Sequence, residues 1–221
     1  MKVVIFDMDG TLLDSKKDIT ISINYIRELH YNLPPLSEEF VVEAINMEER
    51  NLSKMFYGTD TYQDKDREVF EIHYAMQCTQ NPYLYDGVLD TLEKLLASGV
   101  KLSVATNAPT PFALRMLKHL KVADMFDVII GADKVKCSKP DPEMLNEILN
   151  HYDFDKTKHR AWLVGDSSKD MLSAENASIK GLFATWGFSP NGKYERLIHM
   201  PKEILDIVLQ EVYYYDKISK I

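Results

Sequence analysis

The chain opens with Met1-Lys-Val-Val-Ile-Phe-Asp7-Met-Asp9-Gly10-Thr11-Leu-Leu-Asp14, the most informative stretch of its sequence. Residues 3–6 form a short apolar run rich in β-branched residues, which is typical of a strand buried on both faces of a parallel sheet. Two carboxylates and a glycine follow at once. A strand that ends this way delivers its acids to the carboxyl edge of the sheet, where open α/β folds bind ligands.

Asp7 and Asp9 are separated by a single residue. Two carboxylates this close repel each other unless a cation, or a proton held on one of them, relieves the charge. The pair therefore indicates a metal site with one acid as ligand and the other as proton carrier. An Asx turn or a helix N-cap is the simpler interpretation of a single Asp after a strand. That interpretation does not account for the full string with Gly10-Thr11 behind it.

Composition limits the class of protein and its partners. With 45% hydrophobic and 27% charged residues the chain has the composition of a soluble globular protein, and its 221 residues allow one large domain or a core with one sizeable insertion. The net charge is −8 and the basic residues form no stripe, so we expect no nucleic-acid partner. No apolar run approaches membrane-spanning length, so we expect no membrane partner.

Three further observations predict a cytoplasmic protein. Cys78 and Cys137 lie far apart and lack metal-ligand spacing, which fits a reducing compartment better than a disulfide framework. The N-terminus passes directly into the predicted strand and shows no signal-peptide pattern. The histidines form no paired metal motif.

The periodicity of apolar residues divides the chain into two regions. Residues 15–81 show helical spacing, beginning with Ser15-Lys-Lys-Asp18, which resembles a capping box. Further helices are expected after Ser37, over 51–57 and along Val69, Ile72, His73 and Met76. From residue 82 on, helices and strands alternate, with strands expected at 100–105, 128–130, 161–164 and 181–185.

Such alternation predicts an α/β fold with a Rossmann-like parallel sheet covered by helices on both faces. We expect residues 1–14 and 82–221 to form this core and residues 15–81 to form an inserted α-helical cap domain. The insertion begins directly after Asp7 and Asp9, so it would enter and leave near the carboxyl edge of the sheet. A lid over the catalytic edge suits that position.

Polar side chains also follow three later strands. Thr106 and Asn107 come after the strand at 100–105, and Lys139 stands in a Lys-Pro-Asp-Pro string after the strand at 128–130. Asp166 and Asp170 follow the strand at 161–164. Each element alone is weak evidence, because a strand-end Thr usually packs and a Lys before Pro is usually solvated. Their joint occurrence at one edge of one sheet points to a single site.

With these residues in view, the chain resembles the haloacid dehalogenase-like hydrolase superfamily, in the branch with a helical cap after the first strand. The resemblance spans nearly the whole chain and rests on Asp7-Met-Asp9-Gly10-Thr11, Thr106, Lys139 and Gly165-Asp166 with Asp170. The first and last of these motifs together are highly specific. The chain is most similar to phosphoglycolate-phosphatase-like and β-phosphoglucomutase-like members, including Leu12-Leu13-Asp14-Ser15.

This resemblance implies a Mg²⁺-dependent phosphatase that forms an aspartyl-phosphate intermediate. Asp7 would be the nucleophile, and Asp9 would protonate the leaving group and then activate water. Asp7, the main-chain carbonyl of Asp9 and Asp166 would hold Mg²⁺. Asp170 would orient a metal-bound water or Lys139, or ligate directly.

The same resemblance assigns the phosphate contacts. Lys139 would neutralise the phosphate and the nucleophile together, whereas Thr106, with Asn107 as a further candidate, would orient the phosphoryl oxygens. Dehalogenases of this superfamily need no acid for a halide leaving group and match the chain less well at Asp9. The presence of Asp9 therefore favours phosphoryl transfer.

Several alternatives stay open at this point. A sugar-phosphate mutase would keep the same core residues and add cap cations such as Arg50 or Lys54, for which a solvated helix face is the simpler interpretation. Lys54 also suggests a phosphonate hydrolase, in which a cap lysine forms a Schiff base with an aldehyde substrate. The residues around Lys54 in the sequence give this alternative little support. A non-enzymatic phospho-ligand binding protein is disfavoured because no core position is missing, and receiver domains order their acids differently.

The expected partner is a small phosphorylated metabolite. Phosphoglycolate leads by resemblance, whereas other sugar or nucleotide monophosphates and pyrophosphate remain open because cap residues set the specificity. The expected assembly is a monomer or a homodimer.

Overall fold

The computed structural model describes residues 1–47, 50–189 and 193–218, with side chains described up to residue 210 in the last of these ranges. Its main feature is a parallel sheet with the strand order β5-β4-β1-β6-β7-β8. The strands are β1 (Lys2–Phe6), β4 (Lys101–Thr106), β5 (Val128–Gly131), β6 (Arg160–Gly165), β7 (Lys180–Ala184) and β8 (Leu197–Ile198). The predicted α/β fold is therefore confirmed.

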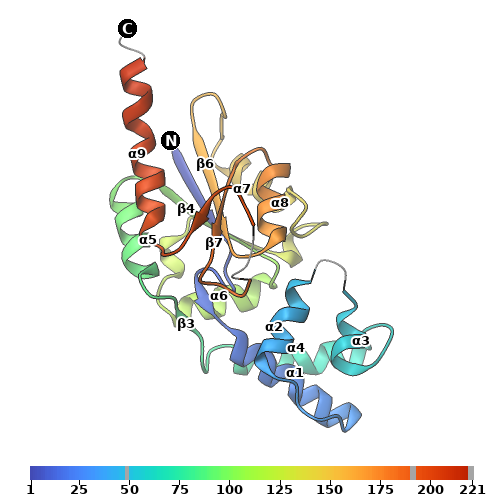
Figure 1. Ribbon diagram of the computed structural model, residues 1–221. Coiled ribbons are helices and arrows are strands. Elements are labelled where there is room, and N and C mark those ends of the chain that lie inside the picture. Colours follow the sequence, from blue (N-terminus) through green and yellow to red (C-terminus); the bar gives the residue numbers. More distant parts are fainter. Residues whose placement is uncertain (48–49, 190–192, 219–221) are drawn as a thin grey trace.

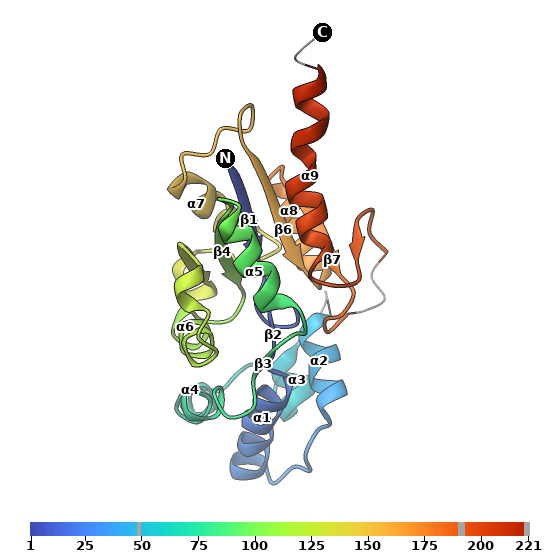
Figure 2. The ribbon, with the colours of Figure 1, turned by 90° about the vertical axis from the view of Figure 1, so that its left-hand side faces the viewer.

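Helices cover both faces of the sheet (Figures 1 and 2). The helices α5 (Val88–Ala97), α6 (Thr110–His119) and α9 (Glu203–Ile218) contribute to one apolar core, and α7 (Glu143–His151) and α8 (Ser168–Asn176) to the other. Successive residues of β1 alternate between these cores: Val4 and Phe6 belong to the first, Val3 and Ile5 to the second. This double burial explains why residues 3–6 of the strand are all apolar, whereas Lys2 lies at its half-buried start.

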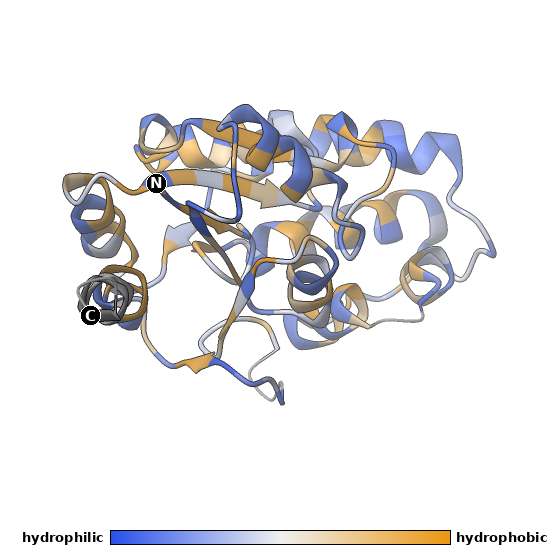
Figure 3. Ribbon diagram, turned by 90° about the horizontal axis from the view of Figure 1, so that it is seen from above, coloured by the Kyte–Doolittle hydropathy of each residue, from blue (hydrophilic) through white to orange (hydrophobic). Residues whose placement is uncertain are grey.

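The colouring by hydropathy agrees with this layered arrangement. Hydrophobic residues gather on the strands and on the inner sides of the helices, whereas hydrophilic residues dominate the outer helical surfaces (Figure 3). Across the residues that the structure describes, no helix combines the length and the apolar character needed to cross a membrane.

Four helices pack together beyond the carboxyl ends of the strands (Figures 1 and 2). They are α1 (Lys16–Tyr31), α2 (Glu38–Asn46), α3 (Leu52–Tyr57) and α4 (Asp64–Gln77). They enclose an apolar cluster of their own that includes Ile26, Val41, Ala44 and Phe56. The antiparallel pair β2 (Leu13–Asp14) and β3 (Tyr83–Leu84) lies where the chain enters and leaves this helical unit. We refer to residues 15–81 as the cap, and its division from the core at 14/15 and 81/82 stays a prediction.

The capping box expected at Ser15-Lys-Lys-Asp18 is wrong. Ser15 makes no side-chain cap bond, and its hydroxyl donates to Asp9. Asp18 is fully buried and accepts hydrogen bonds from Gln77 and from both the main chain and the side chain of Asn81. Both side chains therefore bond residues at the junction of cap and core instead of capping α1. Partners that are distant in the sequence replace the local bond that a capping box would form.

The expected helix after Ser37 and the one over 51–57 are confirmed, and Ser37 accepts the cap bond from Phe40. The helix along 69–76 forms as α4, but Ile72 and Met76 are 67% and 61% exposed, so the apolar face expected there is wrong. Tyr74, on another side of α4, is buried against the core. The short strands β2, β3 and β8 were not predicted, since two-residue strands leave no periodic signal.

Candidate active site

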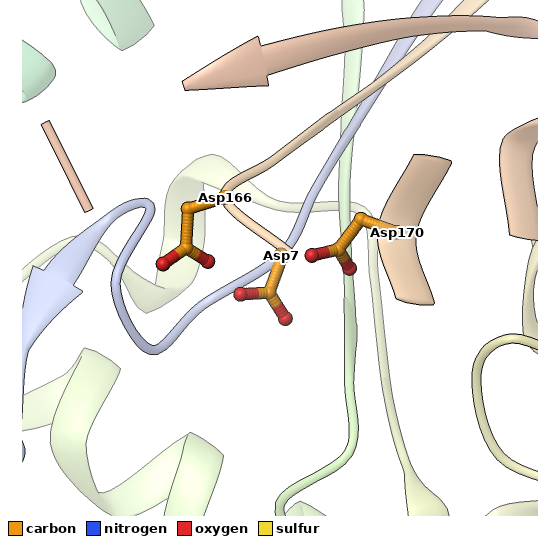
Figure 4. A group of neighbouring side chains, drawn as sticks. All are labelled: Asp7, Asp166 and Asp170. Carbon is orange, nitrogen blue, oxygen red and sulfur yellow. The ribbon is translucent and has the colours of Figure 1, made fainter. Parts of the chain in front are cut away.

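Three carboxylates meet at the carboxyl edge of the sheet. Asp7 follows β1, Asp166 follows the neighbouring strand β6, and Asp170 lies in the first turn of α8. One carboxylate oxygen from each lies within 4.8 Å of the others, and all three residues are buried. Figure 4 shows the side chain of Asp7 between those of Asp166 and Asp170. The topology explains the meeting, because parallel neighbouring strands end at the same edge.

Lys139 supplies the charge that balances this cluster. Its Nζ lies 2.6 Å from Oδ1 of Asp7 and 2.6 Å from Oδ1 of Asp170, and its side chain is 2% exposed. Burial alone lowers the pKa of Lys139, but the attraction of Asp170 and Asp7 outweighs it and raises the pKa above its usual value. Lys139 is therefore charged at neutral pH.

Asp170 is fully engaged by protein groups. Its Oδ1 accepts from Lys139, and its Oδ2 accepts from the main-chain N–H of Ser167 at 3.1 Å and from the Ser167 hydroxyl at 2.5 Å. Ser167 and Asp170 form a capping box at the start of α8. These bonds fit the orienting role expected for Asp170 better than direct ligation.

Asp166 sits in a pocket formed by two loops. Its Oδ2 accepts from the main-chain N–H of Phe188 at 2.6 Å, and its Oδ1 from the Thr11 hydroxyl at 3.3 Å. Gly10 has a φ of +88°, and a Cβ there would collide with the carboxylate of Asp166. The glycine of the opening stretch is thus required both for its backbone conformation and for the close approach of Asp166.

The side chain of Asp9 bonds a residue at the start of the cap. It accepts a hydrogen bond from the hydroxyl of Ser15, the first residue of the expected cap. Burial raises the pKa of the Asp9 carboxyl above its ordinary value, and the bond from Ser15 opposes this change only in part. A carboxyl whose pKa is raised holds a proton more readily, as a proton carrier must.

Thr106 and Asn107 lie at the end of β4, on the other side of β1. The Thr106 side chain lines the site and accepts from the main-chain N–H of Ala108 at 3.0 Å. The Asn107 amide bonds the main chain of Lys139 in both directions, at 2.9 and 3.0 Å. Its geometry therefore supports positioning of Lys139, whereas the phosphate contact expected for Asn107 stays a prediction.

The charge of the cluster is incompletely balanced. Burial raises the pKa of Asp7 to about 7 despite the attraction of Lys139, and raises that of Asp166 well above its usual range, with repulsion from Asp7 and Asp170 adding to it. Asp7, Asp9, Asp166 and Asp170 thus share one ammonium. Buried oxygen donors in this arrangement fit a hard divalent cation such as Mg²⁺, which would relieve the repulsion.

A cavity of about 300 Å³ lies over these groups and beneath the cap. All seven predicted site residues line it. Its other walls come from the cap, from loops and from the helices α6 and α8, and most of these side chains are apolar: Lys16, Ile19, Val41, Val42, Ile45, Asn46, Arg50, Leu52, Phe70, Tyr74, Ala108, Pro109, Phe112, Ser167, Lys169 and Phe188. A larger groove of about 690 Å³ adjoins this cavity and shares Lys16, Val42, Asn46 and Phe188 with it, and one of about 740 Å³ lies elsewhere. Neither contains the carboxylate cluster.

The two cap cations considered from sequence differ in position. Arg50 lines the cavity and donates to the carbonyls of Ile45 and Met47, so the solvated face expected for it is wrong. Lys54 is exposed and lies 3.8 Å from Asp60, outside the cavity lining. The position of Lys54 gives a phosphonate-cleaving Schiff base no support.

Sequence reasoning missed three supporting groups: Ser15, Ser167 and the main-chain N–H of Phe188. The spacing of Ser167 and Asp170 is a recognisable capping-box signal and could have identified Ser167. Phe188 follows a different strand, and no local pattern marks its N–H as a partner of Asp166.

Comparison with known proteins adds independent information. A family model described as haloacid dehalogenase-like hydrolase matches residues 4–184. A phosphoglycolate phosphatase of Vibrio parahaemolyticus is 32% identical over 199 residues, covering 86% of each chain. An N-acetylmuramic acid 6-phosphate phosphatase of Pseudomonas aeruginosa is 28% identical over 217 residues, covering 94% of this chain and 95% of the relative.

The fold is shared as well. A crystal structure of a predicted phosphoglycolate phosphatase from Haemophilus somnus superposes with a TM-score of 0.81 at 26% identity, covering 94% of this chain and 97% of the other. The family match spans β1 through β7, and so includes every strand end that carries a site residue. The chain belongs to the haloacid dehalogenase-like hydrolases.

Proposed function

We propose that the protein is a Mg²⁺-dependent phosphatase that hydrolyses a small phosphomonoester through an aspartyl-phosphate on Asp7. The single observation that carries the proposal is the contact of Lys139 with Asp7, which leaves the nucleophile buried, oriented and beside a fixed positive charge. A phosphate monoester is an anion and is repelled by a carboxylate unless the site neutralises charge first. The relatives named above are phosphatases, which favours hydrolysis over a mutase.

The residues divide the reaction into two steps. Asp7 attacks phosphorus, the bond to the leaving oxygen breaks, and the proton on Asp9 passes to that oxygen. Asp9 then takes a proton from the water that attacks the phosphorus of the intermediate. The bond between phosphorus and the Asp7 oxygen breaks, so that phosphate is released and the Asp7 carboxylate is restored. Thr106 and Lys139 orient and neutralise the phosphoryl oxygens.

Mg²⁺, when bound by Asp7, Asp166 and the main-chain carbonyl of Asp9, would neutralise phosphate oxygens and the carboxylate cluster. Asp170 then holds Lys139 rather than the metal, since both of its oxygens are occupied. The bonds that link Ser167, Asp170 and Lys139 to Asp7 hold the Asp7 carboxylate in place before the substrate binds.

The substrate is a small phosphorylated metabolite. Relatives named for phosphoglycolate and for N-acetylmuramic acid 6-phosphate show about equal similarity to this chain, at 32% and 28% identity. Phosphoglycolate is the leading candidate within this class of small phosphomonoesters, because the phosphoglycolate phosphatases are the more identical of the two kinds of relative. The free thiols of Cys78 and Cys137 support the expected cytoplasmic location.

Metal binding should stabilise the fold more at high pH than at low pH. Burial raises the pKa of Asp7 from its ordinary value of 3.8 to about 7 in the metal-free folded protein. Between these two pKa values the Asp7 carboxyl is protonated in the folded protein and ionised in the unfolded chain. The contribution of Asp7 to metal-free stability therefore rises as the pH falls through this window, and Mg²⁺ must displace the proton on Asp7. We expect saturating Mg²⁺ to raise the melting temperature by roughly 5–10 °C near neutral pH and by clearly less near pH 5.

Differential scanning fluorimetry measures this shift. The Asp166→Asn variant is the control, because it removes one proposed ligand and should lose most of the effect. An equal shift in this variant, or a larger shift at acid pH, would contradict the proposed metal site.

Removal of the nucleophile should abolish hydrolysis. We expect Asp7→Asn to lower kcat by at least about 10³-fold across a panel of small phosphomonoesters that includes phosphoglycolate. Released phosphate is the measurement. Asp90→Asn, the same change at an exposed residue of α5, should retain wild-type activity. Activity that survives in Asp7→Asn would rule out Asp7 as the nucleophile.

Loss of the proton carrier should depend on the leaving group. In Asp9→Asn, the first step, in which Asp7 is phosphorylated and the alcohol is released, should slow by about 10²–10⁴-fold with an alkyl phosphate. The effect should be much smaller with para-nitrophenyl phosphate, whose leaving group departs without a proton. Rapid-quench kinetics separate this step from hydrolysis of the intermediate. Equal slowing with both esters would remove Asp9 from the role of acid.

A further inference from the structure

The outer surface of the cap carries an exposed apolar patch on α1 and α4. Tyr25 and Leu29 lie one turn apart on α1 and are 43% and 53% exposed. Ile72 and Met76 lie one turn apart on α4 and are more exposed still. The ring of Tyr25 stacks on that of His73, the neighbour of Ile72 in the sequence, with ring centroids 4.2 Å apart. The four apolar residues therefore form one surface, which we call the outer cap patch.

The outer cap patch faces away from the catalytic cavity. On α4, the cavity is lined by Phe70 and Tyr74. Ile72 and Met76 each come two residues after one of these, which is about 200° around a helix. Apolar side chains that are exposed singly are normal, but a group of four on adjoining helices is typical of a protein interface. A partner bound there would leave the cavity lining uncovered.

The helices α1 and α4 pack side by side and run antiparallel. The Ser22 hydroxyl bonds Nδ1 of His73 at 2.9 Å. One turn earlier on α1, Asp18 accepts a hydrogen bond from Gln77, which comes one turn later on α4. The Ser22–His73 bond therefore marks one common level along both helices.

Opposite charges lie on α1 on either side of this level. Lys17 and Glu28 are exposed, and neither has an ion-pair partner in the part of the chain that the structure describes. Their separation in the sequence corresponds to about three helical turns, or about 16 Å, so they lie on the same side of α1. Their midpoint falls between Ser22 and Ile23. The two charges are therefore nearly equidistant from the Ser22–His73 level.

The apolar residues of α4 are symmetric about the same level. The midpoint of Ile72 and Met76 is the residue that follows His73. A two-fold axis across both helices at this level would therefore place Lys17 of one copy against Glu28 of the other, twice. The same axis would bring Ile72 of each copy beside Met76 of the other. Such self-complementarity is what an isologous dimer interface requires.

We propose that the outer cap patch binds a second copy of this chain, with α1 packed on α1 and α4 on α4 of the other copy about a two-fold axis. An unrelated partner gives no reason for charges and apolar residues to be symmetric about one level. Over the 14 residues of α4, two helices that are each about 10 Å across offer a face of roughly 400 Å² per copy, about half of a standard interface. The dimer is therefore reversible, with a Kd on the order of 10–100 µM.

Sedimentation equilibrium of the full chain tests the dimer. Over about 1 to 500 µM, the average mass of the wild type should rise from one chain toward two. Ile72→Glu brings two buried charges into the interface and should raise the Kd by at least about tenfold. Leu89→Glu, the same kind of change at a leucine of α5 that is 43% exposed, should keep the wild-type Kd.

Charge reversal tests the two-fold arrangement. Lys17→Glu or Glu28→Lys alone makes both contacts between the copies repulsive, so each should raise the Kd by about tenfold. An equimolar mixture of the two variants should restore the wild-type Kd, because both contacts of the mixed dimer again join opposite charges. Neither variant should unfold the cap. The new acid lies in the first turn of α1 and the new base in its last turn, and both positions suit the helix dipole.

Three results would overturn the inference. A wild type that stays monomeric across the whole range leaves the patch to a different partner. A dimer that Ile72→Glu does not weaken uses another face of the molecule. Charge variants that keep the wild-type Kd, or that weaken the dimer without recovery in the mixture, exclude the antiparallel pairing of α1.

Discussion

The ammonium of Lys139, fixed between Asp7 and Asp170, is the contact on which the site depends. Three buried carboxylates, those of Asp7, Asp166 and Asp170, share this edge of the sheet, and their repulsion would force protonation or local opening without a buried cation. The surrounding bonds hold the ammonium in place: Asn107 clamps the main chain of Lys139, and Ser167 fixes Asp170. Asp7, the proposed nucleophile, is therefore oriented by contacts that reach it through Lys139 as well as by its own backbone.

The fold divides the candidate site between the sheet and the helical cap. Neighbouring parallel strands β4, β1 and β6 deliver Thr106, Asp7 and Asp166 to one edge, so the reaction chemistry rests on the sheet. The cap closes the cavity from the other side, mainly with apolar walls. Ser15 and Lys169 connect the two parts, because Ser15 bonds Asp9 and Lys169 bonds the end of α2.

Much of this could be predicted from sequence, for physical reasons. The strand before Asp7 is buried on both faces and therefore carries an uninterrupted apolar signal, and parallel strands necessarily end together. Contacts between residues that are far apart in the sequence leave no such periodic signal. Ser15 was expected to cap a helix but binds Asp9, Asp18 ties the cap to Asn81, and Ile72 is exposed although its spacing suggests a core. Arg50 could not be assigned to the cavity, because its place depends on how α2 packs over the sheet.

The central claim is that Asp7 becomes phosphorylated during turnover. Rapid acid quench of the enzyme with an excess of a hydrolysed phosphomonoester, followed by borohydride reduction, converts an aspartyl-phosphate to homoserine. Mass spectrometry of the digested protein then locates the modified residue. The account predicts homoserine at position 7, dependent on substrate and on Mg²⁺, and unmodified aspartate at positions 9, 166 and 170. Modification at another residue, or turnover with no modified residue, would contradict it.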